Sequence, residues 1–218
     1  MNVVIQCAAS KSRQAGYLCD KRERQVMFVA DPSIAPKSDR LTYAGPDDIG
    51  GARSWREQLS NYNENPRNNP LNLLPAYQLY NNSAYSQLVE ALGIERVFIL
   101  SAGWGLIKAS FLTPNYDITF SASAEKYKRR RKSDHYRDFS QLVLSSTEDL
   151  IFFGGKDYIP LFHKLSAGYN GTRYIPFNSK IKPDAPGCKL VKYETTTRTN
   201  WHYECVRAFL AGSFTVSN

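Results

Sequence analysis

The feature that most constrains the fold is a helix, a short apolar strand and a glycine turn that follow one another directly. Residues 83–92 have helical periodicity behind a serine cap, Gly93 ends the helix, and residues 96–100 form a buried strand. The turn Ser101-Ala-Gly-Trp-Gly-Leu106 comes next. A unit of this kind is typical of proteins in which helices cover a β-sheet.

The same order returns further along the chain. Residues 123–144 are expected to form a helix, residues 150–153 a strand, and Gly154 and Gly155 a turn before a helix over 157–165. Further strands are expected at 2–7, 26–30, 173–176 and 189–193, and a last helix, capped by Asn200, runs to about residue 210. The alternation predicts an α/β fold with a mainly parallel central sheet and helices on both faces.

A length of 218 residues suits one domain, so we expect a single α/β domain over residues 1–218. Residues 31–75 interrupt the pattern, because they are rich in Pro, Gly, Asn and Asp and offer only one helix, around 54–62. This segment is predicted to be a loop-rich insertion. Its expected role is a lid or a recognition loop, with a solvated spacer as the alternative.

The charge of the chain favours a polyanionic partner. There are 28 Lys+Arg against 20 Asp+Glu, a formal net charge of +8, and six basic residues fall within 126–132. They are Lys126, Lys128, Arg129, Arg130, Arg131 and Lys132, predicted to lie on a helix that contacts nucleic acid, DNA rather than RNA. Tyr127, His135 and Tyr136 add rings that stack on bases or fill the helix's buried face. A merely solvated helix face is the alternative.

Several classes of site lack their sequence signatures. The cysteines have no CxxC spacing and the histidines no HExxH spacing, so we predict neither a disulfide nor a metal site. A P-loop, a GxGxxG fingerprint and a GxSxG elbow are missing too, and we predict no nucleotide cofactor. With no leader sequence and no apolar stretch of roughly 18 residues, we expect a cytoplasmic protein without a membrane partner.

The two glycine turns are expected to meet at the carboxyl edge of the sheet, where open α/β sheets bind ligands. Residues 101–105 and 154–158 both follow a strand, and glycines there leave backbone N–H groups free to face a base or a phosphate. Gly154-Gly-Lys also precedes a helix whose amino terminus attracts anions. The alternative for the first turn is a tight bend in which Trp104 fills core space.

Asp117, in Pro114-Asn-Tyr-Asp117, is the best placed carboxylate for acid–base work or for stabilising an oxocarbenium-like centre. An Asx turn is its alternative role. Asp157 is equally suited to be a helix cap or a first-turn residue that complements the helix dipole.

The spaced segments resemble the YaaA-like superfamily, and most closely its small uncharacterised branch. They are Cys7-x-x-Ser10-Lys11-Ser12, Pro75-Ala-Tyr-Gln-Leu-Tyr80, Ser101-Ala-Gly-Trp-Gly-Leu106, Pro114-Asn-Tyr-Asp117 and Gly154-Gly-x-x-Tyr158. The resemblance implies an α/β fold related to DNA-binding peroxide-stress proteins and to domains that accompany base transglycosylases. It marks as candidate substrate-binding residues Cys7, Ser10, Lys11, Tyr80, Ser101, Gly103, Trp104, Gly105, Gly154, Gly155 and Tyr158.

These observations lead to one hypothesis and two alternatives. The hypothesis is a nucleic-acid-directed enzyme, an N-glycosidase that excises an unusual base flipped into a pocket floored by residues 101–105 and stacked on Trp104 or a tyrosine. Lys11 would hold phosphate and Asp117 would act as the catalytic carboxylate. The alternatives are a non-catalytic protein that protects DNA and a hydrolase of free nucleosides or nucleotides.

Overall fold

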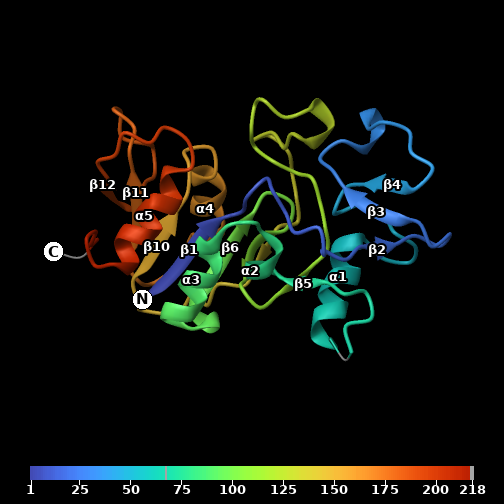
Figure 1. Cartoon of the computed structure of the whole chain (residues 1–218), viewed down its shortest axis with the longest axis horizontal. Coiled ribbons are helices and arrows are strands. Elements are labelled where there is room, and N and C mark those ends of the chain that lie inside the picture. Colours follow the sequence, from blue (N-terminus) through green and yellow to red (C-terminus); the bar gives the residue numbers. More distant parts are fainter. Residues whose placement is uncertain (67, 217–218) are drawn as a thin grey trace.

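The structure, a computed structural model, describes residues 1–66 and 68–216. Its centre is a seven-stranded sheet in the order β12-β11-β10-β1-β6-β7-β9 (Figure 1). All neighbouring strands are parallel except β6 and β7, which are antiparallel. The strands are β1 (Asn2–Gln6), β6 (Val97–Ser101), β7 (Gly105–Lys108), β9 (Phe139–Ser140), β10 (Leu150–Phe153), β11 (Arg173–Phe177) and β12 (Lys189–Lys192). The predicted α/β fold with a mainly parallel sheet is confirmed.

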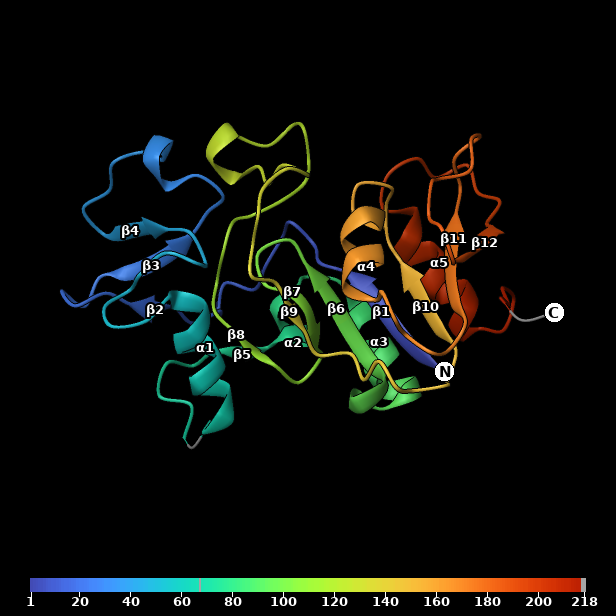
Figure 2. The same ribbon diagram turned by 180° about the vertical axis from the view of Figure 1, so that it is seen from behind.

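Helices cover both faces of this sheet. The helices α3 (Ser83–Leu92) and α5 (Trp201–Leu210) contact each other and lie on the face toward the viewer in Figure 1. The helix α4 (Ile159–Leu165) lies on the opposite face, as Figure 2 shows. Coverage from both sides explains why every residue of β6 and β10 is buried and why both strands are apolar apart from Ser101 at the end of β6.

The strand order contains a topological switch point beside β1. From β1 the chain moves through α3 to β6 on one side, and it later returns to β10 on the other side. The helix α3, between β1 and β6, and the helix α4, between β10 and β11, lie on opposite faces of the sheet. The loops after β1 and β10 therefore diverge and leave space between them. This arrangement predicts a ligand site at the carboxyl ends of β1 and β10.

A second, smaller region lies at the β9 end of the molecule (Figures 1 and 2). It holds the sheet β2-β3-β4 and the helix α1 (Trp55–Glu64). Ser54 and Glu57 cap the amino terminus of α1 with a reciprocal capping box. Its other elements are β2 (Leu18–Cys19), β3 (Gln25–Phe28), η1 (Pro32–Ile34) and β4 (Leu41–Ala44). The chain joins the main sheet again through β5 (Leu74–Pro75), which pairs with β8 (Leu112–Thr113), and α2 (Ala76–Leu79).

The predicted helix over 123–144 is wrong. Only the single turn η3 (Lys126–Lys128) and the short strand β9 occur there. The backbone around Arg129 instead pairs with Thr119: the Thr119 N–H donates to the Lys128 carbonyl, and the Arg130 N–H donates to the Thr119 carbonyl. Like charges three and four residues apart disfavour a helix, and tertiary contacts of this segment decide its shape.

Three capping details also differ from expectation. Asn82, not Ser83, caps α3, with its side chain accepting from the Ala84 N–H. Asn200 precedes α5 as expected, but it adopts the left-handed conformation (φ 59°) and makes no side-chain cap. Asp157 does not cap α4, because that helix begins at Ile159.

Candidate functional site

A cavity of about 790 Å³ lies at the carboxyl ends of β1, β10 and β11. Its wall is formed by the segments that follow these strands and by the start of α5, together with residues 81–82 and 119–122. This is the place that the strand order predicts, and the volume is within the usual range for small-molecule sites. The cavity is therefore the candidate functional site.

Cys7, directly after β1, lies in the wall of the cavity and is 4% exposed. Its Sγ accepts a hydrogen bond from the Ala102 N–H at 3.4 Å and lies 3.3 Å from the Tyr158 hydroxyl. Burial raises the pKa of Tyr158, with Cys7 adding to the effect, so its phenol stays protonated at neutral pH. Tyr158 is thus a hydrogen-bond donor at the edge of the cavity.

The second glycine turn also lies in the wall. Gly154 is fitted tightly, because a Cβ there would lie 2.2 Å from the Phe152 ring, whereas a Cβ on Gly155 would meet nothing nearer than the Gln6 side chain at 3.5 Å. The Gly155 N–H donates to Gln6 Oε1 at 2.6 Å. This N–H is therefore occupied by the protein itself, and the expected anion site at the helix amino terminus is not formed by it.

His202, in the first turn of α5, is the most unusual polar group of the cavity wall. It is 3% exposed, and its Nε2 atom is buried without a hydrogen-bond partner among the described residues. Burial lowers its pKa to about 4, so the imidazole is neutral at neutral pH. A buried nitrogen without a partner is costly to the fold, which favours a role for it in ligand binding.

Three charged side chains face or border the cavity. Lys156 and Asp157 follow β10 and are exposed, and Arg198, which precedes α5, is an exposed residue of the wall. Asp157 makes no ion pair within the described part of the chain. It is the carboxylate of this site that remains available for chemistry.

The first glycine turn, residues 101–105, is enclosed within the protein instead of facing the cavity. Ser101 Oγ accepts from the N–H groups of Gly103 and Trp104 and donates to the Tyr116 hydroxyl, at 3.2, 3.1 and 2.8 Å. The Tyr116 hydroxyl lies 2.8 Å from the hydroxyl of Tyr80, which is itself buried. The N–H groups of Gly103 and Trp104 are therefore used within the turn, and that of Ala102 donates to Cys7 Sγ, so none of the three faces a ligand.

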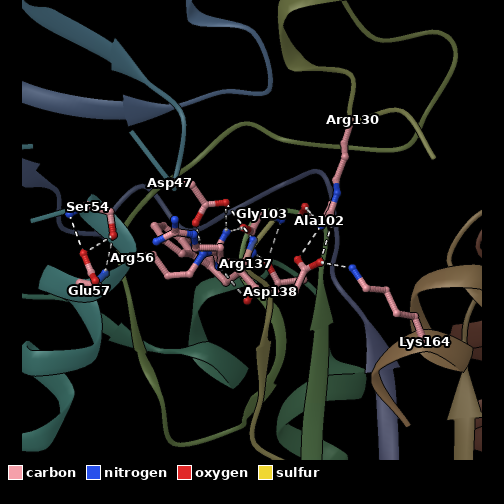
Figure 3. Close-up of polar contacts among 12 residues, drawn as sticks. Asp47, Ser54, Arg56, Glu57, Ala102, Gly103, Arg130, Arg137, Asp138 and Lys164 are labelled. Carbon is pink, nitrogen blue, oxygen red and sulfur yellow. Dashed lines mark hydrogen bonds and ion pairs between the residues drawn. The ribbon is translucent and has the colours of Figure 1, made fainter. Parts of the chain in front are cut away.

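Two buried arginines hold the carbonyl groups of the same turn (Figure 3). Arg56 donates to the carbonyls of Gly103 and Trp104 at 3.0 and 3.1 Å, and Arg130 donates to that of Ala102 at 2.8 Å. Each guanidinium is paired with a carboxylate: Arg56 with Asp47 at 2.6 Å, and Arg130 with Asp138 at 2.6 Å. Segments from three parts of the sequence thus close around this turn.

Trp104 and Gly105 have structural roles in this enclosure. Trp104 is fully buried and packs edge-on against Phe28 and Tyr116, so it has no face on which a base can stack. Gly105 has φ 91°, and a Cβ there would lie 2.5 Å from the Phe139 carbonyl oxygen. The predicted pocket floor at residues 101–105 is therefore corrected: the turn lies behind Cys7 and supports the cavity from outside its wall.

Asp117 and Lys11 lie together beside the cavity and are not part of its wall. The Asp117 carboxylate, 40% exposed, pairs with Lys128 Nζ at 2.8 Å instead of forming an Asx turn. Lys11 Nζ lies 4.1 Å from the centre of the Tyr116 ring, and burial lowers its pKa against the opposing effects of Cys7 and Asp117. Neither residue occupies the position that the sequence suggested for it.

The basic segment 126–132 is divided between internal contacts and solvent. Lys128 pairs with Asp117 and Glu125, and these two hydrogen bonds raise its pKa. Arg129 donates to the Ala122 carbonyl, and Arg130 is 5% exposed. The exposed members of the set are Lys126, Arg131 and Lys132.

The structure brings together five of the predicted residues and leaves out the others. The five in the cavity wall are Cys7, Ser10, Gly154, Gly155 and Tyr158. Sequence reasoning missed further residues of the wall, among them Gln6, Phe120, Asn178, Arg198, Trp201 and His202. One signal was available for Gln6 and Asn178, since each follows or ends a parallel strand at the ligand-binding edge.

Other parts of the molecule offer less chemistry. A hollow of about 690 Å³ near α1 and β7 is lined by Glu64, Lys108 and mostly neutral side chains, and contains none of the predicted site residues. Among residues 1–66 and 68–216, no group of three His, Cys, Asp or Glu side chains could hold a metal ion. Within the same residues no helix has both the length and the apolar character to cross a membrane.

Comparisons of the chain with protein-family models, with curated proteins and with solved structures found no match.

Proposed function

We propose that the chain is a nucleic-acid-directed N-glycosidase that removes an unusual base from DNA, and that the cavity at the ends of β1, β10 and β11 is its base pocket. The observation that carries the proposal is the carboxylate of Asp157, which forms no ion pair with any described residue and lies on the wall of a cavity that also presents aromatic rings and amides. Phe120 and Trp201 offer rings for a flipped base, and Asn178 offers an amide for its edge.

In this reaction the bond between C1′ of the sugar and the base nitrogen breaks, and positive charge develops on the sugar. The Asp157 carboxylate stabilises that charge and orients a water molecule. The water oxygen bonds to C1′, and its proton leaves with the base. Tyr158 contributes a protonated phenol that donates to the base or to its neighbour Cys7.

The carboxylate role is assigned to Asp157 and not to Asp117. The charge of Asp117 is already balanced by Lys128, and Asp117 is absent from the cavity wall. Asp157 is exposed to the cavity and has no such partner among the described residues. This choice makes the two aspartates a matched pair for experiment.

The test is to incubate the purified protein with DNA that carries deaminated, oxidised or alkylated bases and to detect abasic sites by alkaline strand cleavage. Asp157→Asn should lower the rate at least about 100-fold, the usual effect of losing an acid–base group, whereas Asp117→Asn should stay near wild type. Circular dichroism confirms that both variants are folded. Absence of abasic sites on every substrate, or equal rates in the two variants, would overturn the proposal.

A second candidate is a hydrolase of free nucleosides or nucleotides. The observation that favours it is the internal pairing of Lys128, Arg129 and Arg130, which leaves a smaller basic surface for a polymer than the sequence indicated. Incubating the protein with nucleosides and nucleotides that carry the same modified bases distinguishes the two functions. Release of base from monomers but not from DNA identifies this function, while binding of DNA without any product identifies a non-catalytic DNA-binding protein.

A further inference from the structure

A small hollow of about 80 Å³ lies next to the cavity of about 790 Å³ and shares two wall residues with it, Phe120 and Asp157. Four basic side chains, Arg130, Arg131, Lys132 and Lys164, form much of the rest of its wall. Among the described residues, Asp134 supplies the only other carboxylate of this wall. The hollow is therefore a cationic compartment with Asp157 on the boundary between it and the cavity.

Three of the four cations are available to a ligand. The Arg130 guanidinium is occupied by Asp138 and the Ala102 carbonyl. Arg131 and Lys132 are exposed and form no ion pair with any residue that the structure describes. Lys164, from the last turn of α4, is 59% exposed, and its ion pair with Asp138 is long, at 3.8 Å, because Arg130 already balances the charge of that carboxylate.

The buried ion pair also fixes where these cations lie. Both members of the Arg130–Asp138 pair are nearly inaccessible, with side chains 3% and 1% exposed. Arg131 and Lys132 follow Arg130 directly, and the Arg131 N–H donates to the Asp134 carboxylate at 2.7 Å, which closes the turn. A turn anchored in this way presents its two charges at a defined position, which reduces the entropy lost when a ligand binds.

We infer that this hollow is a phosphate subsite, which holds a phosphate group of the same nucleotide whose base enters the cavity. Arginine and lysine are the side chains that bind phosphate oxygens best, through charge-assisted hydrogen bonds. The inference rests on the proposed function, because it orders the substrate as base, sugar and phosphate along the two compartments. The sugar then lies at their shared boundary, beside the carboxylate of Asp157.

The test measures binding of inorganic phosphate by ³¹P NMR line broadening, which requires neither a base nor turnover. The variant Arg131→Ala/Lys132→Ala/Lys164→Ala should weaken phosphate binding at least about tenfold, since it removes several charge-assisted hydrogen bonds. The charge-matched control is Lys21→Ala/Arg22→Ala/Arg40→Ala, which removes three exposed cations from the loops of the small sheet. The control should bind phosphate as the wild type does, and equal binding by the two triple variants would overturn the subsite.

The abasic-site assay on the same proteins separates this inference from the proposed function. If DNA is processed but phosphate binding is the same in all proteins, the subsite is wrong and the glycosidase stands. If no DNA is processed but the Arg131, Lys132 and Lys164 variant alone loses phosphate, the glycosidase is wrong and the subsite stands. Asp157→Asn should keep phosphate binding at wild-type strength or above, because it removes a negative charge from the boundary; weaker binding would contradict the assigned geometry.

Discussion

The two glycine turns of this protein look alike in sequence and differ in function within the structure. Residues 101–105 and 154–158 each follow a fully buried parallel strand. The first turn is closed by Ser101, Arg56 and Arg130, which occupy its N–H and carbonyl groups. The second turn forms the wall of a cavity and leaves Lys156 and Asp157 exposed.

A strand followed by glycines thus marks a sharp turn and not necessarily a binding site. At Gly105 the glycine is required by a positive φ and by the approach of the β9 backbone. At Gly155 the space around the missing Cβ is open except for the Gln6 side chain. What separates the two is which neighbours satisfy the backbone, and those neighbours come from distant parts of the chain.

The largest expected effect comes from breaking the ion pair that closes the first turn. Arg130→Leu leaves the Asp138 carboxylate buried without its partner, which should lower the free energy of unfolding by about 3–5 kcal/mol. Urea denaturation measures the loss. Arg129→Leu is the matched control, because the Arg129 side chain forms one hydrogen bond with the described residues, to the Ala122 carbonyl, and its loss should cost less than about 1 kcal/mol. Similar losses in both variants would show that the turn does not depend on this pair.

A pH-dependent effect should come from the cavity side, at His202. Its ordinary pKa of 6.5 applies to the unfolded chain and its pKa of about 4 to the folded protein. As the pH falls from 6.5 to 4, the unfolded chain binds a proton that the folded protein does not, so stability is lost across this window, by up to about 3 kcal/mol. His202→Gln should lose less stability between pH 7 and pH 4 than the wild type in urea titrations. Parallel pH profiles for the two proteins would contradict the buried, neutral state of this side chain.

The smallest of the three effects compares one alanine substitution in each turn. Gly105→Ala should lower the free energy of unfolding by about 2–3 kcal/mol, because alanine is strained at φ 91° and its Cβ meets the Phe139 carbonyl. Gly155→Ala should change it by less than about 1 kcal/mol, since its new Cβ has ordinary contacts. Thermal unfolding of both variants measures these losses. A larger loss for Gly155→Ala than for Gly105→Ala would mean that the roles of the two turns are exchanged.

Local patterns in the sequence were enough to predict most of the fold. Residues 3–5, 97–100 and 150–153 are all apolar because helices cover both faces of their sheet, so their character is visible without knowledge of the rest of the chain. The segment 123–144 could not be predicted in the same way. Its shape depends on Thr119 and Asp138, partners that only the folded structure brings to it.

The candidate site was predictable in its location but only partly in its residues. Cys7, Tyr158 and the second glycine turn follow strands, and the parallel order places the ends of those strands at one edge. His202 and Arg198 come from α5 and the segment before it, about 50 residues after β10, and no local spacing connects them with Cys7. The sequence pattern predicts Trp104 in the pocket although the structure buries it, because the sequence of a turn does not show how exposed its side chains are.

The working surface that we propose for this protein is the cavity at residues 154–158 and not the turn at 101–105. Amide hydrogen exchange, measured with and without a single-stranded oligonucleotide that carries the processed base, distinguishes these two surfaces. We expect new protection at residues 154–158 and 178–179, with exchange at 101–105 already slow and unchanged by the ligand. Protection gained at 101–105 without any change at 154–158 would contradict this proposal.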